Sequence, residues 1–315
     1  MIVTVTLNTA LDVTYRVPRL LPHASHRVSD VIERPGGKGL NVARVLAALG
    51  HEVTATGFAG GPAGEAVRAG LAAHAPGVVD ALVPCAGPTR RTLAVADAAT
   101  GDTTQFNEPG PLITTAEWAA FQGRYETLVR SSARPVAAVA LCGSLPPGVP
   151  VGAYALLIRT ARAAGVPVLL DTSGEALRRG IAARPEMIKP NAAELAELTG
   201  SRDPLPATRD ARRRGAHAVI TSLGPAGLLA ATPQGTWRAA PPRALSGNPT
   251  GAGDSAVAGL LSALAEGLDW PARLTRAVAL SAATVHSPVA GEFDPRTYEE
   301  VRGSVTVTQA PGPGQ

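Results

Sequence analysis

The amino-acid sequence predicts an α/β fold, in which helices cover both faces of a doubly wound parallel sheet and a small β-sheet forms a lid. From residue 136 onward, short β-rich runs alternate with helical patterns at the spacing of strand–helix units in a parallel sheet. In the first third, other β segments are interleaved with such units, which indicates a small sheet projecting from the main domain. The 315 residues, 45% of them hydrophobic, suffice to bury a large core and exclude a disordered chain.

The first third is predicted to supply the lid and the first strand of the main sheet. Residues 1–7 alternate like a strand, and a helix that ends near Gly50 follows a glycine-rich turn. We expect the lid to be built from about residues 13–32 and 90–107. Two of its strands are predicted at 13–17 and 27–32, separated by prolines. The other two are predicted at 91–96 and 103–106, joined by a turn that contains glycine.

The remainder of the chain is predicted to build the main sheet and its helices. The expected strands are 136–141, 166–170, 187–188 and 218–221. The expected helices are 151–164, 175–180, 191–199, 251–266 and 272–285. We therefore expect one domain over residues 1–307, followed by a disordered tail rich in Pro and Gly at 308–315.

Composition excludes several classes of protein. Cys85 and Cys142 cannot form a disulfide framework and lack metal-ligand spacing, so we interpret both as core residues in a reducing cytoplasm. No apolar run reaches the roughly 18 residues of a membrane helix. The net charge of +4 comes from scattered arginines, and their densest run, 209–214, fits a solvated helix face better than a patch for an anionic partner. We expect neither a membrane nor a nucleic-acid partner.

Lysine and asparagine are scarce enough to draw attention to each one. The chain is dominated by Ala, Arg, Gly and Pro, a composition typical of GC-rich genomes, which replace Lys and Asn wherever a substitute is tolerated. The survivors are therefore candidate functional residues: Lys38, Lys189, Asn8, Asn41, Asn107, Asn191 and Asn248.

The strongest chemical signal is the segment 248–255, which runs directly into an apolar helix. Gly251, Ala252 and Gly253 at a helix N-terminus would present free N–H groups and the positive end of the helix dipole to a phosphoryl group. Asp254 would then be placed to accept the proton of an attacking hydroxyl. Taken alone, an Asp in the first turn of a helix is better explained by stabilisation of the helix dipole than by catalysis.

A second glycine-rich turn, residues 35–39, also opens a helix. It is not a Walker A loop, because Lys38 is followed by Gly39 instead of Ser or Thr. Gly37, Lys38 and Asn41 could hydrogen-bond a polyhydroxy or phosphorylated ligand. A tight turn before a helix, with no ligand, explains this segment equally well.

Together the two segments resemble the ribokinase-like PfkB carbohydrate kinases. Gly36-Gly37, Asn41, Ala43, Gly50 and Gly60 follow the N-terminal signature of that family, and 248–261 fits its C-terminal signature. Residues 8–12 are similar to the Asn-Pro-Ala-Leu-Asp start of the hexose-phosphate branch, with Thr9 in place of Pro. The resemblance covers roughly residues 1 to 300 and implies a ribokinase-like fold.

The resemblance also implies which residues hold the sugar phosphate. Asp12 would bind sugar hydroxyls, because a carboxylate accepts two hydrogen bonds at once. Lys38 and Arg90 would bind the phosphate that the substrate already carries, and Ser144 could donate to it. Arg27, on a lid strand, matches a phosphate position that can be contributed across a dimer, although an exposed strand charge would explain it equally well.

On the nucleotide side, the resemblance implies ATP and Mg²⁺. Glu194 would organise the metal through water, while Asn191 would contact the ATP phosphates. From the residues alone, this pair looks like a helix N-cap followed by an acidic residue at the third position. The residues expected to contact nucleotide are Lys189, Asn191, Glu194, Ser222, Gly224, Thr250, Gly251 and Gly253, with the region around 281–283 beside the adenine.

The predicted reaction is therefore phosphorylation of a ketohexose phosphate by ATP. Lys38 inside Gly-Gly-Lys-Gly favours a 1-phosphofructokinase, which makes fructose 1,6-bisphosphate, with a tagatose-6-phosphate kinase as the alternative and a 6-phosphofructokinase after it. A sugar-phosphate sensor without activity is a more distant alternative, because it would need neither Asp254 nor Glu194. The exposed lid sheet needs cover, so we expect a homodimer formed through the lid.

Overall fold

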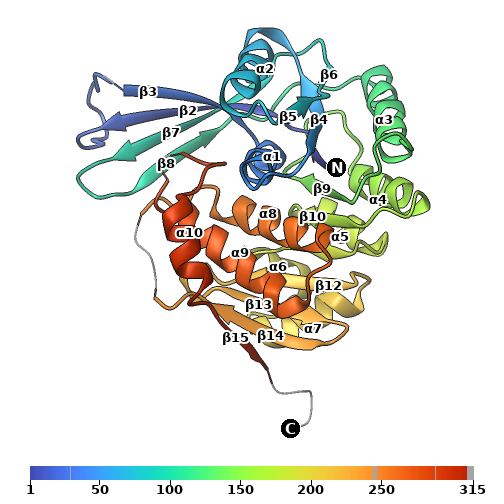
Figure 1. Cartoon of the computed structure of the whole chain (residues 1–315). Helices are drawn as coiled ribbons and strands as arrows, with labels where there is room; N and C mark the ends of the chain where they lie inside the picture. Colours follow the sequence, from blue (N-terminus) through green and yellow to red (C-terminus); the bar gives the residue numbers. More distant parts are fainter. Residues whose placement is uncertain (29, 244–246, 288, 311–315) are drawn as a thin grey trace.

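Eleven strands of the described residues form one large sheet in this computed structural model, which describes residues 1–28, 30–243, 247–287 and 289–310 (Figure 1). Its parallel part runs in the order β12 (Ala218–Ser222), β11 (Met187–Ile188), β10 (Val168–Asp171), β9 (Ala138–Cys142), β1 (Ile2–Thr6), β4 (Val53–Ala59) and β5 (Val78–Asp80), and the short β6 (Val83–Pro84) pairs with β4. The chain enters the sheet at the interior strand β1 and builds outward on both sides of it, so the doubly wound prediction is confirmed.

The parallel strands are buried on both faces because helices cover both. One hydrophobic cluster packs the strands against α1 (Lys38–Ala48), α2 (Gly61–His74), α8 (Ala252–Ala265), α9 (Trp270–Thr284) and α10 (Pro295–Arg302). A second packs the opposite face against α3 (Thr115–Val129), α4 (Ala153–Ala163), α5 (Gly174–Ala182), α6 (Ala192–Thr199) and α7 (Pro204–Arg213). Strand β1 shows the division, since Ile2 belongs to the first cluster and its neighbour Val3 to the second.

The parallel strands are rich in apolar residues for the same reason. Every residue of β9, with the sequence Ala-Val-Ala-Leu-Cys, is buried. A strand covered by helices on both faces has no solvent side on which polar residues could alternate. Helix α8 is likewise buried over ten consecutive residues, which explains why it is apolar on all sides.

One edge of the large sheet is antiparallel, which the sequence analysis did not predict. Strands β13 (Leu228–Thr232) and β14 (Gly235–Ala240) form a hairpin beside β12, and β15 (Thr306–Gln309) pairs with β14. The Pro-Gln-Gly turn between two β-rich runs was the available signal. The expected tail was wrong at its start, because Thr308 and Gln309 pair with Arg238 and Trp237 in this edge. Residues 311–315 lie outside the described residues.

The lid is a separate four-stranded sheet, as expected, in the order β3 (Asp30–Gly36), β2 (Ala10–Val17), β7 (Arg90–Asp97) and β8 (Thr103–Asn107). It projects beyond the end of the large sheet (Figure 1). The predicted β7–β8 hairpin is present. The strand expected at 27–32 was displaced, because β3 starts at Asp30 and continues to Gly36, so Arg27 lies in the exposed connection before it.

The remaining predicted elements are present with ends shifted by a few residues. The helices α1, α4, α5, α6, α8 and α9 and the strands β1, β9, β10, β11 and β12 all occur where the sequence indicated. No helix in the described ranges has the length and apolar character needed to cross a membrane.

Candidate active site

The carboxyl ends of the parallel strands open into one large cleft under the lid. Ligands of open α/β sheets bind at this edge, because the loops that leave the strands surround it. The cleft has a volume of about 1180 Å³. The sequence-predicted residues that line it are Asp12, Gly37, Lys38, Asn41, Arg90, Ser144, Lys189, Asn191, Glu194, Ser222, Thr250, Gly251, Gly253 and Asp254.

Three predicted residues do not line this cleft. Gly224 and Ala252 line an adjoining cavity of about 500 Å³, which shares Gly253 with the cleft. Arg27 is exposed in the connection between β2 and β3 and lines neither cavity. A role for Arg27 in the site of a second subunit stays a prediction.

Two glycines allow α1 to begin directly against the floor of the cleft. A Cβ on Gly36 would lie 2.1 Å from Cγ of Asp12, where no side chain fits. Gly37 precedes α1 with φ 95°, a conformation that L side chains rarely adopt, and a Cβ there would lie 2.7 Å from Cγ2 of Thr6. The Gly-Gly pair therefore lets the carboxylate of Asp12 and the helix N-terminus share one small space.

A buried hydrogen bond joins the two glycine-rich motifs. Nδ2 of Asn41 in α1 donates to Oδ2 of Asp254 in α8 at 2.9 Å. Asp254 is 7% exposed. Burial raises the pKa of Asp254 to about 6, while Lys38 and the hydrogen bond from Asn41 oppose the rise because they stabilise the carboxylate. A carboxylate with a pKa just below neutrality is ionised at pH 7 and well suited to accept a proton.

Both lysines of the chain approach one carboxylate that the sequence analysis did not select. Nζ of Lys38 lies 3.4 Å from Oδ2 of Asp171, and Nζ of Lys189 lies 3.5 Å from Oδ1. Asp171 ends β10 and is 1% exposed. Its charge raises the pKa of Lys38 above the usual value. The available signal was an Asp directly after a buried apolar strand, because a charge at such a position needs a partner.

The loop before α8 has the geometry that the predicted anion site requires, with one correction. Gly251 has φ 83°, and a Cβ there would lie 2.9 Å from Cα of Ala290, so glycine is required. The N–H of Ala252 is not free, because it donates to the Pro249 carbonyl at 3.1 Å. The N–H groups of Gly253 and Asp254 have no hydrogen-bond partner within the described residues.

A lysine lies beside these free N–H groups. A Cβ on Gly253 would lie 3.5 Å from Nζ of Lys189. The ammonium group and the helix N-terminus thus place positive charge on one spot, opposite the carboxylate of Asp254. This arrangement can stabilise a phosphoryl group while a hydroxyl is deprotonated next to it.

The cap of α6 occupies the nucleotide end of the predicted site. Asn191 Oδ1 accepts from the Glu194 N–H, and Glu194 Oε2 accepts from the Asn191 N–H, both at 2.9 Å. The capping interpretation is therefore confirmed, and it is compatible with a ligand role because both residues line the cleft. Oε1 of Glu194 makes no hydrogen bond within the described part of the chain and is available to water or a metal.

The adjoining cavity has mainly apolar walls, which would suit a flat ring system. Its walls include the apolar side chains of Leu228, Ala256 and Val278. Ser281 and Ala282, from the region expected beside adenine, also line it. Ligand pockets of this kind combine apolar walls with a few polar groups that fix orientation.

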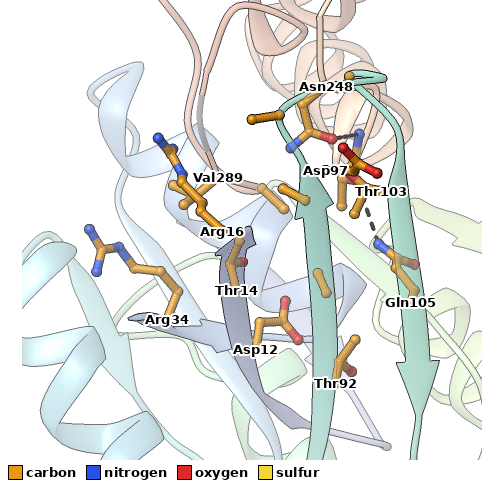
Figure 2. A pocket seen from close by; sticks show the side chains of 16 residues that line it. Asp12, Thr14, Arg16, Arg34, Thr92, Asp97, Thr103, Gln105, Asn248 and Val289 are labelled. Carbon is orange, nitrogen blue, oxygen red and sulfur yellow. Dashed lines mark hydrogen bonds between the residues drawn. The ribbon is translucent and has the colours of Figure 1, made fainter. Parts of the chain in front are cut away.

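The inner face of the lid closes the other end of the cleft. Figure 2 shows Asp12 on this face, in a cavity of about 290 Å³ bounded on its far side by the loop that carries Asn248 and Thr250. Burial raises the pKa of Asp12 to about 6, and the charge of Arg90 opposes the rise. Gln105 of β8 lies 3.5 Å from Oγ1 of Thr250, so the lid touches the loop before α8.

A family model described as "pfkB family carbohydrate kinase" matches residues 3–296. The chain belongs to the PfkB family of carbohydrate kinases. A protein of this family is a phosphotransferase that acts on a sugar hydroxyl, and the family implies ATP as the phosphoryl donor. The resemblance inferred from the two glycine-rich motifs is thereby confirmed.

Individual relatives agree with this assignment. A 1-phosphofructokinase of Rhodobacter capsulatus is 40% identical over 291 residues, which cover 89% of this chain and 90% of that protein. A Thermotoga maritima structure described as a possible 1-phosphofructokinase has a TM-score of 0.89 at 26% identity, covering 99% of this chain and 100% of that one. Phosphofructokinase-2 from Escherichia coli in complex with potassium has a TM-score of 0.88 at 31% identity, covering 96% and 98%.

The Escherichia coli enzyme is also known in other states. It has been solved in complex with fructose 6-phosphate and as a tetrameric inhibited form. These relatives confirm the ribokinase-like fold and support a sugar-phosphate kinase.

Proposed function

We propose that this PfkB kinase phosphorylates a ketohexose phosphate with ATP, and that it is a 1-phosphofructokinase. The observation that carries the proposal is the placement of Lys38, Arg90 and Ser144 with Asp12 and Asp254 in one cleft. Cations beside a sugar-binding carboxylate suit a sugar that already bears a phosphate. The 40% identity to a 1-phosphofructokinase favours fructose 1-phosphate.

Two other sugar phosphates are alternatives to fructose 1-phosphate. The first is tagatose 6-phosphate, because tagatose-6-phosphate kinases and 1-phosphofructokinases both resemble this chain in having a lysine in the Gly-Gly-Lys-Gly turn, here Lys38. A 6-phosphofructokinase is the second, supported by the neighbour solved with fructose 6-phosphate. Fructose 1-phosphate differs from both alternatives in which end of the ketohexose carries the phosphate, whereas tagatose 6-phosphate and fructose 6-phosphate differ from each other in the configuration at C4.

In the proposed mechanism, Asp254 accepts the proton of the attacking sugar hydroxyl. The carboxylate is held in place by Asn41, so the developing alkoxide forms beside the phosphoryl group. The N–H groups of Gly253 and Asp254 and the ammonium of Lys189 offset the charge that spreads over the phosphoryl oxygens. The lid above Asp12 excludes water and limits transfer of the phosphoryl group to water.

The residues present fit a Mg²⁺ ion that is held mostly by substrate. Mg²⁺ typically keeps several waters and binds one or two carboxylates together with phosphates of the substrate. Glu194 offers one oxygen in the cleft, and no cluster of three or more His, Cys, Asp or Glu side chains that could hold a metal occurs in the described residues. Glu194 would hold the ion through water, and the ion would neutralise charge on the ATP phosphates.

A substrate panel tests the proposed function. Wild-type protein is incubated with ATP, Mg²⁺ and one of fructose 1-phosphate, fructose 6-phosphate, tagatose 6-phosphate, fructose or ribose, and ADP release is measured. We expect the highest kcat/KM with fructose 1-phosphate and little turnover of the two unphosphorylated sugars. Turnover of none of the five would refute the hexose-phosphate kinase and favour the sensor, provided that a sugar phosphate still binds.

Asp254→Asn tests the proposed base. Asparagine has the same shape but cannot accept the proton, so kcat should fall by about 10² to 10⁴. Binding of the sugar phosphate, measured by isothermal titration calorimetry, should remain within about threefold because no phosphate-binding residue changes. Asp210→Asn on the exposed side of α7 is the matched control. Retention of wild-type kcat by Asp254→Asn would rule out its role as base.

The pH dependence follows from the raised pKa of Asp254. Because the base must be ionised, kcat/KM should be constant near pH 8 and fall as the pH drops below about 6. Lys38→Met removes a positive charge that lowers this pKa, so its acidic limb should move to higher pH. Arg130→Met, at the residue that follows α3, should leave the limb in place. Identical acidic limbs in wild type and Lys38→Met would contradict this electrostatic coupling.

We also propose a homodimer formed through the lid. Val31 and Phe106 are large hydrophobic residues of the lid that are 51% and 58% exposed. Their strand partners Tyr15 and Leu93 alternate with Asp12 and Thr92, so all four apolar residues lie on the face away from the cleft. An apolar sheet face of this kind is usually covered. A tetramer is known for one neighbour, and oligomers are therefore compatible with this fold.

Phe106→Glu tests the dimer. A charge in the centre of an apolar interface should shift the protein from dimer to monomer, as measured by sedimentation velocity at micromolar concentration. Leu112→Glu makes the same change at a residue that is 69% exposed but outside the lid strands, and it should remain dimeric. A monomeric wild type would refute the proposal.

The cytoplasm is the proposed compartment. Cys85 and Cys142 are both free thiols, as expected where disulfides are reduced. ATP and sugar phosphates are held inside the cell, so the proposed substrates agree with this location.

A further inference from the structure

Asn8 contacts two of the residues proposed to hold the substrate's phosphate, Ser144 and Arg90. It follows β1 and is 6% exposed. Its Nδ2 donates to Ser144 Oγ at 3.0 Å, and its backbone carbonyl accepts from Nε of Arg90 at 3.2 Å. Ser144 lies just after β9, and Arg90 is the first residue of β7. Asn8 therefore links two proposed phosphate contacts that come from different elements.

The chemistry of the neighbours fixes the orientation of the Asn8 amide. Nδ2 also lies 3.1 Å from the carbonyl oxygen of Pro109, which can only accept a hydrogen bond. The nitrogen of the amide must therefore face Pro109, and its second hydrogen goes to Ser144. On the other side of the amide, a Cβ on Gly110 would lie 2.1 Å from Oδ1 of Asn8, so the backbone there closes on the amide.

This orientation decides what Ser144 can donate to. A serine hydroxyl has one hydrogen and accepts through its lone pairs. Because Oγ of Ser144 already accepts from Asn8, its own hydrogen points elsewhere. Ser144 is exposed and lines the cleft, together with Lys38 and Arg90. A hydroxyl hydrogen beside two cations suits an anionic ligand.

We infer that Asn8 is a positioning residue for the substrate's phosphate, and that it acts by keeping the Ser144 hydroxyl as a donor. The inference rests on the proposed function and adds to it a residue that sets the preference for phosphorylated over unphosphorylated sugar. The backbone carbonyl of Asn8 fixes Nε of Arg90 at the same time, so the two contacts keep a constant separation. Only the first of these effects depends on the side chain.

Asn8→Asp is the direct test. The carboxylate has nearly the same shape but can only accept, so it would turn the Ser144 hydroxyl toward itself and away from the phosphate. The KM for fructose 1-phosphate should rise about tenfold or more, the scale of one lost hydrogen bond to a charged group. The KM for ATP should stay within about twofold of wild type, because no nucleotide contact changes.

Two further variants separate hydroxyl orientation from charge. Asn107→Asp brings the same negative charge into the same cleft from β8, at a residue that makes no hydrogen bond to Ser144 within the described residues. In a Ser144→Ala background there is no hydroxyl to orient. We therefore expect the effect of Asn8→Asp in that background to shrink to the effect of Asn107→Asp. Asn8→Ala, which removes the donor without adding charge, replaces Asn8→Asp in the same cycle if the latter fails to fold.

The outcomes that overturn the inference are specific. Asn8 would be only a structural residue if Asn8→Asp raised the KM for fructose 1-phosphate no more than Asn107→Asp does. The same conclusion would follow if Asn8→Asp raised this KM equally with and without the Ser144 hydroxyl. Calorimetric binding of fructose 1-phosphate without ATP is a second readout, independent of turnover. If the wild-type protein binds a sugar phosphate without turning it over, and Asn8→Asp abolishes that binding, the proposed kinase activity is refuted but the positioning role of Asn8 stands. Absence of binding in wild type would overturn both.

Discussion

The buried hydrogen bond between Asn41 and Asp254 joins the two helices that carry the glycine-rich motifs of the cleft. It joins α1 to α8 across 213 residues of chain. One turn further along α1, the buried Arg44 donates to the Ala290 carbonyl at 2.9 Å and pairs with Glu292. Ala290 in turn packs against Gly251, where a Cβ would not fit. The position of α1 therefore sets both the carboxylate of α8 and the loop that precedes it.

The cleft contains buried charged and polar atoms whose hydrogen bonding the described residues do not complete by themselves. Oδ2 of Asp171 and Oδ1 of Asn41 are buried without a hydrogen-bond partner in the described part of the chain. An unsatisfied buried polar group typically costs about 1–3 kcal/mol. Lys38 and Lys189 compensate the charge of Asp171 but leave it incompletely hydrogen-bonded. Such atoms gather at one edge of the sheet, where a ligand and water can complete their bonding.

Much of the fold was predictable, because the features that identify it are local. Buried apolar strands alternating with amphipathic helices predicted the parallel sheet, and the turn at 99–102 predicted the lid hairpin. The β13–β14 hairpin was missed although its Pro-Gln-Gly turn is a local signal, and β15 was missed because it pairs with a strand that is distant in sequence. The ends of β3 were misjudged because Arg27 and Asp30 are equally polar, and only pairing with β2 determines which residue begins the strand.

The sequence by itself determined which residues are candidates for the site: the two lysines, the Gly-Ala-Gly-Asp segment and the Asn-x-x-Glu element are all recognisable from type and spacing. Tertiary structure alone decided how they act on one another. It brings Asp171 between two lysines that are distant from it in sequence, gives the Ala252 N–H a backbone partner that removes it from the predicted anion site, and places Asn8 between Ser144 and Arg90. These relations depend on the order of strands in the sheet, which places distant strand ends side by side, and spacing along the chain does not contain that information.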